Sequence, residues 1–437
     1  MANIVDILAY LWGIPLTLFI VVAGLYFSKC INFIQFKNSK LIIKNTIGKI
    51  KNNNSYRIIT SVLGGTIGSG NIAGIATAIA IGGPGAVFWM WFVSFLSMAT
   101  KMVEVTLAVH YQKKYDNNNI GGAMYYISSI KGRIGKILAA LYSVALLIYV
   151  LCDAGFVQIN TVATSLIDTF SIKPLYVGIL LLVISFIVIK GGLKRIGNLL
   201  EKTVPIMCGL YIIISLIVIT INYKNIPNAI INVFKYAFKP APIIGGFAGS
   251  TMIQAISKGA SRGIFANEAG TGTSTTVHAT TSNKAIVQGL WGIVEVYIVS
   301  FIICTITAFL VLTTNSWTTG LDGAPMVLNA YQGVFGNFGK YILCIMISLF
   351  AYTTYIGFYY EYTTCIKYIL NNKFYNILKW IYLFPIFMAV YMPISSIWTF
   401  ADISVGFIVI PNIIALLILS KQFKVLFEKS KIKKIRC

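Results

Sequence analysis

Acidic residues and histidine are scarce in this 437-residue chain, which carries 12 Asp and Glu against 35 Lys and Arg, and only 2 His. The 7 cysteines stand singly, and no pair has the spacing of a metal or redox motif. The apolar segments hold no recognisable Ser/His/Asp set, Cys/His pair or metal cluster. These shortages make an enzyme the least favoured class, with no catalytic residues and no bound cofactor expected.

Charged residues of any kind make up only 11% of the chain, whereas 57% is hydrophobic. This composition is typical of an integral membrane protein whose main surroundings are the lipid bilayer. The net charge of +23 is large, but Lys and Arg gather in short loops between apolar runs. The positive charge therefore indicates membrane topology, and no nucleic-acid partner is expected.

Hydropathy predicts an all-α membrane protein with eleven spans. The second and seventh spans are interrupted by glycines, and each begins a set of five. This pattern predicts a 5+5 inverted repeat preceded by one extra helix. The spans are expected at 5–29, 56–82, 84–109, 134–168, 174–190, 203–221, 245–281, 285–313, 340–368, 377–393 and 398–420. The expected domains are an N-terminal helix with a basic loop (1–55), two five-helix repeats (56–240 and 241–422) and a basic tail (423–437).

The distribution of basic residues also predicts the orientation in the membrane. If the N-terminus is outside, the loops assigned to the cytoplasm hold about five basic residues for each one on the other side. The first residues lack the positive charge of a signal peptide, so the first span is expected to be retained. We therefore predict a multi-pass protein of the cell (inner) membrane, with its N-terminus outside and its C-terminus in the cytoplasm.

The second span contains a glycine-rich stretch, residues 63–74, with five glycines. Each glycine costs a helix about 1 kcal/mol relative to alanine, so the helix is expected to break. Backbone groups freed inside a membrane need partners, which favours a break around a ligand. The alternative is that the glycines are packing surface for neighbouring helices. The residues expected to contact the ligand here, with backbone N–H groups holding an anion, are Thr66, Gly68, Ser69, Gly70 and Asn71.

A second break is predicted around residues 263–272, and a cationic group of a ligand is expected to contact carbonyl groups of the first break or those near Phe265 and Asn267. Glu268 lies within this break, and an acid inside a span is a functional hypothesis by default. We expect it to cap the exposed N–H groups of the half-helix that follows. Proton transfer and compensation of a cation are the alternatives.

Other polar residues in the spans have simpler explanations. Glu104 lies one turn after Lys101, so an ion pair between them is expected. His278 stands alone near the end of a span and is expected to be a hydrogen-bonded packing residue. Neither pattern by itself predicts a catalytic or metal site.

Several blocks of this sequence match one family in order: residues 64–74, 82–91, 101–104, 121–126, 191–196, 262–270 and 401–403. Over nearly its whole length the chain resembles the alanine or glycine:cation symporters, which are the sodium–alanine symporters of prokaryotes. The resemblance implies a fold similar to the leucine-transporter class. It also implies that inward sodium flow drives uptake of a small neutral amino acid, alanine or glycine. Sodium would be the only metal, as a coupling ion, and we expect a monomeric transport unit.

The resemblance implies a sodium site as well. Thr353 and Thr354 match the position at which the leucine-transporter class supplies hydroxyl groups to sodium. The alternative is that these hydroxyls bond back to their own helix, which is common in membrane helices. The other oxygens implied are the backbone carbonyls of Gly64, Ile67 and Phe350.

Gln158 follows Gly155 in a stretch that matches the family, and the match implies a ligand contact, with helix–helix hydrogen bonding as the alternative. The chain departs from the family at Phe358, where a tryptophan is usual. If Phe156, Phe265 and Phe358 close the side-chain space, only small substrates are expected to fit.

A gate is implied by Asp402, which opens the last span on its outer side. In the leucine-transporter class an acid near this position pairs with an arginine, which is missing here, and Arg262 is the candidate replacement. A permanent structural pair, or an arginine packed on its own half-helix, is the alternative. For the whole chain, the rival functions are a proton-coupled permease using Glu268 and, less favoured, a channel.

Overall fold

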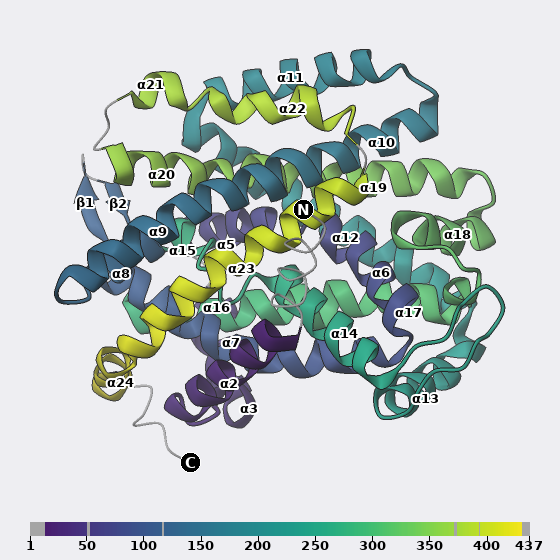
Figure 1. Cartoon of the computed structure of the whole chain (residues 1–437), viewed down its shortest axis with the longest axis horizontal. Coiled ribbons are helices and arrows are strands. Elements are labelled where there is room, and N and C mark those ends of the chain that lie inside the picture. The colour runs from purple at the N-terminus through teal and green to yellow at the C-terminus, as the bar shows by residue number, and fades with distance from the viewer. Residues whose placement is uncertain (1–13, 50–52, 116–117, 371–373, 393, 431–437) are drawn as a thin grey trace.

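The structure of the chain, a computed structural model, describes residues 14–49, 53–115, 118–370, 374–392 and 394–430. This part is mostly helical, with one short antiparallel pair formed by β1 (Lys113–Tyr115) and β2 (Asn118–Ile120) (Figure 1). The helices up to residue 237 are α2 (Ile14–Cys30), α3 (Ile34–Lys37), α4 (Ser39–Asn45), η1 (Ile47–Lys49), α5 (Asn53–Thr66), η2 (Ser69–Asn71), α6 (Ala73–Gly82), α7 (Gly85–His110), α8 (Ala123–Ser128), α9 (Arg133–Val150), η3 (Leu151–Gln158), α10 (Ile159–Phe170), α11 (Pro174–Lys190), α12 (Gly192–Ile221), η4 (Tyr223–Asn225) and α13 (Ile226–Ala237).

The remaining helices begin after a loop closed by the β-bridges Ala241↔Ser250 and Ile244↔Phe247. They are α14 (Met252–Asn267), α15 (Thr275–His278), α16 (Ala285–Val296), η5 (Tyr297–Cys304), α17 (Thr305–Thr313), η6 (Ser316–Thr318), α18 (Gly323–Phe335), α19 (Phe338–Gly357), α20 (Tyr359–Leu370), α21 (Tyr375–Leu378), η7 (Ile381–Leu383), α22 (Phe384–Ala389), α23 (Ile394–Ile418) and α24 (Ser420–Lys429).

Within the described residues, five helices are long and apolar enough to cross a membrane, or up to seven if two bent pairs are each counted as one span. The bent pairs are Ser55–Thr66 with Ser69–Gly82, at 70°, and Ile403–Ile418 with Ser420–Lys429, at 58°. The five helices are Gly85–His110, Arg133–Phe170, Gly192–Ile221, Ala285–Thr313 and Phe338–Leu370. The chain is thus a multi-pass membrane protein.

The predicted count of eleven spans is not confirmed. Over 377–393, where one span is expected, the described residues form the short pieces α21, η7 and α22. Pro385 stands in the first turn of α22, a position that suits the start of a helix but not its interior. The expected span at 245–281 is divided between α14 and α15, at the place where the second break is predicted.

Helix α7 lies at the centre of the packing and is buried over most of its 26 residues. It packs along α14 and α16, beside which it is drawn in Figure 1. Glycines allow this close approach: a Cβ at Gly263 of α14 would lie 3.1 Å from the Met90 carbonyl oxygen, and one at Gly292 of α16 would lie 3.1 Å from that of Lys101. The side chains of α7 are therefore held close to both the second break and α16.

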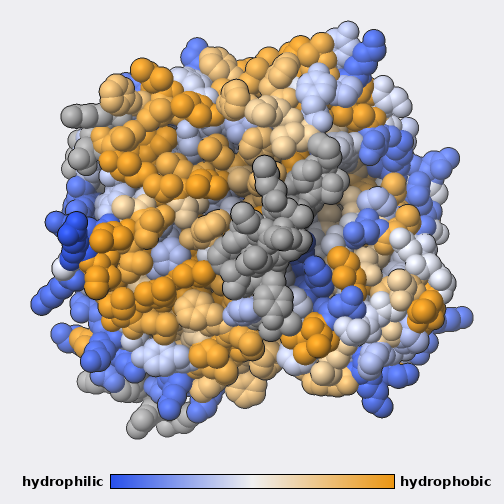
Figure 2. Space-filling view, in the orientation of Figure 1, coloured by the Kyte–Doolittle hydropathy of each residue, from blue (hydrophilic) through white to orange (hydrophobic). Residues whose placement is uncertain are grey.

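The outer surface carries a wide apolar area, which Figure 2 shows across much of one face with hydrophilic residues toward its margins. Helices α9, α11 and α12 contribute exposed residues such as Leu141, Ile179 and Ile213. Contiguous apolar surface of this extent marks contact with a membrane or a partner. Together with the long apolar helices, it is the surface expected to face lipid.

Candidate functional site

The first break lies between α5 and α6, where the chain passes through the short 3-10 turn η2. Gly68 is extended, with φ −120° and ψ −164°, and its N–H donates to Asn71 Oδ1 over 2.8 Å. Ser and Asn compete with the helix for backbone hydrogen bonds, and glycine does not resist an extended conformation, so this sequence favours the break. Ser69, Gly70 and Asn71 are all buried. The break is therefore a polar backbone segment inside the protein.

Gln158 contacts this break directly. Its Oε1 accepts hydrogen bonds from the Ser69 backbone N–H over 3.1 Å and from the Ser69 hydroxyl over 2.9 Å. Its Nε2 donates to Asp153 Oδ1 over 3.4 Å. Gln158 ends the π-helical segment η3, and such segments are frequent at functional sites. The amide oxygen of Gln158 therefore accepts the hydrogen bonds that the Ser69 N–H and hydroxyl of the break donate.

Asn71 joins the first break to the end of α14 and to the α16–α17 helix. Its Nδ2 donates to the Ala266 carbonyl over 3.3 Å and to Cys304 Sγ over 3.4 Å, and its own carbonyl accepts from the Thr307 hydroxyl over 2.9 Å. Phe265 lies against Gly70, where an added Cβ would come within 2.7 Å of the ring. The two breaks therefore meet at this point.

The predicted sodium ligands come from α5 and α19. The Thr354 hydroxyl donates to the Gly64 carbonyl over 3.2 Å, which joins the two helices. The Thr353 hydroxyl instead donates to carbonyls of its own helix, those of Leu349 over 2.8 Å and Phe350 over 3.0 Å. Thr354 thus lies beside the Gly64 carbonyl oxygen at the first broken helix. The Thr353 hydroxyl bonds back to its own helix, which is the alternative to a sodium ligand.

Two further predicted sodium ligands are buried near these threonines. Ile67 is fully buried at the end of the first half-helix, and its N–H donates to the Leu63 carbonyl over 2.8 Å. The Phe350 ring packs edge-on against Tyr211, and its carbonyl accepts from Thr353. Helices α5 and α19 also approach closely nearby, because a Cβ at Gly357 would lie 2.8 Å from Gly65 Cα.

The three phenylalanines predicted to limit substrate size have different neighbours. Phe265 faces Gly70 of the first break. Phe358 is buried with its ring centroid 5.8 Å from that of Tyr149, and its N–H donates to the Thr354 carbonyl. Phe156 is partly buried and packs beside the small apolar cluster around Val157. Of these three phenylalanines, Phe265 is thus the one whose ring lies next to a glycine of the first break.

The second break begins where α14 ends at Asn267. Glu268 is in the left-handed region (φ 52°), and Gly270 (φ 95°) and Gly272 (φ 75°) follow it. The Asn267 side chain accepts from the Ala269 N–H over 3.0 Å and donates to the Ser94 and Ser300 hydroxyls. The chain then resumes a helix at α15.

Glu268 stands at the C-terminal cap of α14, not at the start of the half-helix that follows. Its carboxylate Oε2 accepts a hydrogen bond from the Thr273 hydroxyl over 2.5 Å, and its carbonyl accepts from Lys101 Nζ over 3.3 Å. The expected capping of backbone N–H groups is therefore replaced, in these contacts, by a bond to a hydroxyl one residue before the α15 N-cap, Ser274.

A fully buried cluster of titratable side chains contacts residues at both breaks. Lys101 Nζ is 3.1 Å from Glu295 Oε1, and His278 Nε2 is 3.1 Å from Glu295 Oε2. The Thr66 hydroxyl, at the end of α5, donates to Glu295 over 3.0 Å, and Lys101 donates to the Ser274 hydroxyl over 2.9 Å. Glu295 therefore ties the first broken helix to α16, while Lys101 ties α7 to the second break.

This arrangement corrects the ion pair expected between Lys101 and Glu104. Glu104 Oε1 accepts instead from the Gly270 N–H over 3.0 Å and from Asn412 Nδ2 over 2.6 Å. The break beside α7 exposes backbone donors that an acid must satisfy, and this need separates Glu104 from its neighbour on the helix. His278 has the expected role of a hydrogen-bonded residue, and its Nδ1 lies 2.8 Å from Gln288 Nε2.

Sequence reasoning missed two residues of these networks. Glu295 was visible as an acid within a span, but its pairing with Lys101 depends on how α7 packs against α16. Asn412 of α23 bonds both Glu104 and the Gly270 carbonyl. A signal for it was present, since it is a lone amide next to Pro411 in an otherwise apolar run.

Of the two residues of the predicted gate, the structure describes the side chain of Arg262 only. Arg262 of α14 is 9% exposed, and its guanidinium carbon lies 5.5 Å from the centroid of the Phe265 ring. Such stacking is a cation–π contact. The side chain of Asp402 lies outside the described residues, so the pairing of these two residues stays a prediction.

Comparison with known proteins supports one family. A family model described as the sodium:alanine symporter family matches residues 1–434. The uncharacterized transporter YflA of Bacillus subtilis is 36% identical over 432 residues, covering 96% of this chain and 91% of YflA. The sodium/alanine symporter AgcS of Methanococcus maripaludis is 31% identical over 429 residues, covering 94% of this chain and 93% of AgcS.

Among solved structures, the chain is similar to MhsT, crystallised in complex with L-phenylalanine. The TM-score is 0.61 at 12% identity, with 85% of this chain and 95% of MhsT covered. At this identity the similarity concerns the fold alone, and it agrees with the leucine-transporter-like fold predicted above. The sodium:alanine symporter family consists of transporters, not enzymes, so this chain is a secondary transporter and belongs to the sodium:alanine symporter family.

Proposed function

We propose that this transporter couples inward sodium flow to the uptake of a small neutral amino acid, alanine or glycine, by alternating access. The observation that carries the proposal is the set of oxygens around Gly68, where an added Cβ would lie 2.9 Å from the Thr354 hydroxyl and 3.0 Å from Gln158 Oε1. One glycine then separates the cation position from the amino-acid position. Binding of one ligand would then change the affinity for the other, and this effect is the same in both directions.

The amino-acid site is proposed at the first break. The Ser69 N–H and hydroxyl, which donate to Gln158, are the donors assigned to the substrate carboxylate, and they can exchange one oxygen acceptor for another. The carbonyls near the end of α14 are assigned to the ammonium group. Phe265 against Gly70 supports a small side-chain space. The full proposed set is Thr66, Gly68, Ser69, Gly70, Asn71, Phe156, Gln158, Phe265, Asn267 and Phe358.

Sodium is proposed to bind between α5 and α19. The Thr354 hydroxyl and the Gly64 carbonyl, 3.2 Å apart, support this position, because a sodium ion in a broken membrane helix is held by carbonyls and hydroxyls. The carbonyls of Ile67 and Phe350 complete the proposed set. Thr353 joins it only if its hydroxyl turns away from its own helix, so its contribution is expected to be the smaller of the two.

Alternating access is proposed to use two five-helix repeats, 56–240 and 241–422, in a monomeric unit of the inner membrane with its N-terminus outside. Each repeat opens with a broken segment, α5–α6 or α14–α15, followed by a long buried helix. Reporter fusions test the orientation: a C-terminal phosphatase should stay inactive in cells, and an active one would reverse the topology.

The outer gate is proposed between Arg262 and Asp402. Asp402→Arg and Arg262→Asp should each impair uptake, and the double exchange should restore part of it. Additive losses in the double variant would show that the two residues do not pair.

Proton coupling is the second candidate, because Glu268 and the cluster of Lys101, Glu295 and His278 are titratable groups buried beside the breaks. Uptake of radiolabelled alanine and glycine into proteoliposomes separates the candidates. We expect uptake under an imposed sodium gradient at equal pH and none under a proton gradient alone. Uptake driven by protons without sodium would favour the second candidate, and ungated flux without coupling would indicate a channel.

A further inference from the structure

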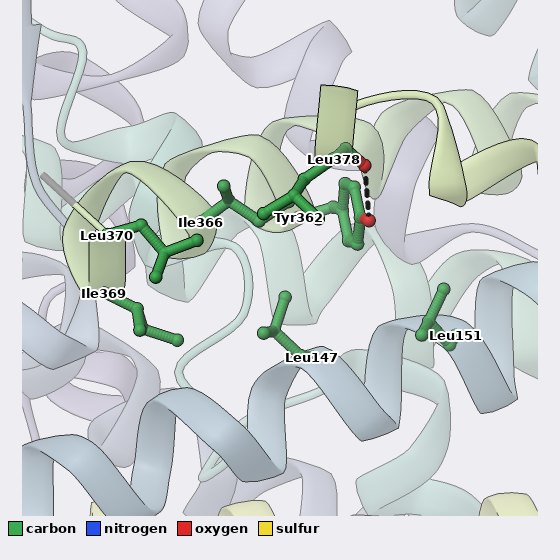
Figure 3. A pocket seen from close by; sticks show the side chains of 7 residues that line it. All are labelled: Leu147, Leu151, Tyr362, Ile366, Ile369, Leu370 and Leu378. Carbon is green, nitrogen blue, oxygen red and sulfur yellow. Dashed lines mark hydrogen bonds between the residues drawn. The ribbon is translucent and has the colours of Figure 1, made fainter. Parts of the chain in front are cut away.

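An apolar cavity of about 170 Å³ lies between α9, η3, α20 and α21. Figure 3 shows the side chains that line it. The hydroxyl of Tyr362 donates to the Leu378 carbonyl over 2.8 Å, so the polar end of this side chain is satisfied. The other lining side chains are hydrocarbon, those of Leu147, Leu151, Ile366, Ile369, Leu370 and Leu378.

The cavity opens beside surface that is expected to face lipid. On α9, Val144 is 53% exposed and Ile148 is 48% exposed, one on each side of Leu147 along the helix. On the other side, Ile369 of α20 is 39% exposed and Ile377 of α21 is 67% exposed. An occupant can therefore enter sideways from the hydrocarbon region of the bilayer.

Positive charge lies beside the same elements. Lys367 Nζ is 4.6 Å from the centroid of the Tyr375 ring, and Lys379 Nζ is 5.8 Å from the same centroid. Lys379 directly follows Leu378 of the cavity wall, and Lys367 directly follows Ile366. Lysines placed over aromatic rings are typical of the membrane interface, where anionic lipid headgroups lie.

We propose that this cavity binds an acyl chain of an anionic phospholipid whose headgroup phosphate contacts Lys367 and Lys379. Burial of acyl methylene groups supplies an apolar contribution, and the two ammonium groups supply preference for a negative headgroup. None of the residues that line the cavity belongs to the proposed sodium and amino-acid sets.

The test uses the full chain, purified in mild detergent, with lipid binding measured by native mass spectrometry. The probes are dioleoyl phosphatidylglycerol and dioleoyl phosphatidylcholine, which share their acyl chains and differ in the structure and net charge of the headgroup. The double variant Lys367→Gln/Lys379→Gln should lose affinity for phosphatidylglycerol by about fivefold per lysine and keep that for phosphatidylcholine. Lys235→Gln, which removes a lysine placed over Tyr236 on α13, is the matched control and should change neither.

A second pair of variants tests the cavity itself. Leu147→Phe adds volume to the cavity wall and should reduce binding of both lipids, whereas Val144→Phe, at an exposed position on the same helix, should not. Thermal unfolding of both variants checks that they fold, and the lysine variant gives a test in which the cavity is intact.

Three results would overturn the proposal. Equal lipid binding by wild type and a folded Leu147→Phe variant would show that the cavity is not occupied. Displacement of phosphatidylglycerol by inorganic phosphate or by the headgroup without acyl chains would indicate an anion site at the lysines only. Equal loss of both lipids in the lysine variant would remove the headgroup preference.

Discussion

The two breaks differ in the chemistry of the groups around them. Around Gly68 and Ser69, the first break contacts neutral hydroxyls and amides, those of Ser69, Gln158 and Thr354, and its one bond to a charged group among those described above is that of Thr66 to Glu295. The second is held by charged groups, because Glu104 accepts from Gly270 and Lys101 donates to Glu268. A neutral donor can exchange one acceptor for another at little cost, whereas a buried charge that loses its partner is strongly destabilising. We infer that the first break makes most of the ligand contacts and that the charged groups around the second hold the site in place.

The largest effect, a loss of stability, is expected from removing a charged group near the second break. Lys101→Met removes the ammonium group that pairs with the buried carboxylate of Glu295 and leaves His278 beside it, and breaking such a buried pair costs about 3–5 kcal/mol. We expect loss of most folded protein, measured by gel filtration and thermal unfolding in detergent. Lys235→Met, at an exposed position, is the control. The double variant Lys101→Met/Glu295→Met should be more stable than Lys101→Met, and a single variant as stable as wild type would contradict the role of this pair.

The next effect concerns the neutral side. Gly68→Ala places a methyl group against Thr354 and Gln158, while Gly65→Ala, near the end of α5, meets nothing within 4 Å. Uptake of alanine should fall on the order of a hundredfold in Gly68→Ala, since displacement by about 1 Å is costly where geometry is tight. Gly65→Ala should stay close to wild type, and both should fold. Equal uptake by the two variants would remove Gly68 from the site.

A smaller effect separates the two threonines of α19. Thr354→Ala removes the hydroxyl beside the Gly64 carbonyl and should weaken apparent sodium affinity about tenfold, the equivalent of one hydrogen-bonding group. Thr353→Ala should have less effect, because its hydroxyl bonds its own helix. The measurement is the sodium dependence of alanine uptake. Thr354→Ser keeps a hydroxyl and should behave as wild type, and equal sodium dependence in both Ala variants would count against the assignment.

The smallest effect is expected on selectivity. Phe265→Ala removes the ring beside Gly70 and should let valine compete with alanine for uptake. The change in the ratio should be about tenfold, because one or two methylene groups in an apolar pocket contribute about 1–3 kcal/mol each. Phe358→Ala and Phe156→Ala, whose rings pack elsewhere, should shift the ratio less. Identical competition profiles in all three variants would show that the substrate side chain points elsewhere.

The sequence predicts those features of the fold that depend on neighbouring residues, and it predicts less well those that depend on packing between distant segments. The break at Gly68 is local, since glycines and small polar residues favour it wherever the chain goes, and it lies where hydropathy and composition predict it. The family and fold follow from blocks that run through the whole chain. The span over 377–393 was not foreseen as short pieces, because hydropathy reports burial in apolar surroundings and not helix continuity.

Side-chain partners were less predictable. Lys101 and Glu104 lie one turn apart, so a rule for neighbours on one helix joins them, yet packing of α16 and of the second break against α7 gives each a different partner. Likewise, two adjacent threonines look equivalent in sequence, while the helix places one toward Gly64 and the other along its own backbone. Contacts of this kind depend on three-dimensional packing.

The most direct test of the central claim is alanine binding to the purified chain at several sodium concentrations, measured by isothermal titration calorimetry. If sodium and the amino acid bind on the two sides of Gly68, alanine affinity should rise with sodium, and sodium affinity should rise by the same factor with alanine. Both effects should be lost in Gly68→Ala and kept in Gly65→Ala. Alanine binding that is equally tight with and without sodium would contradict the account.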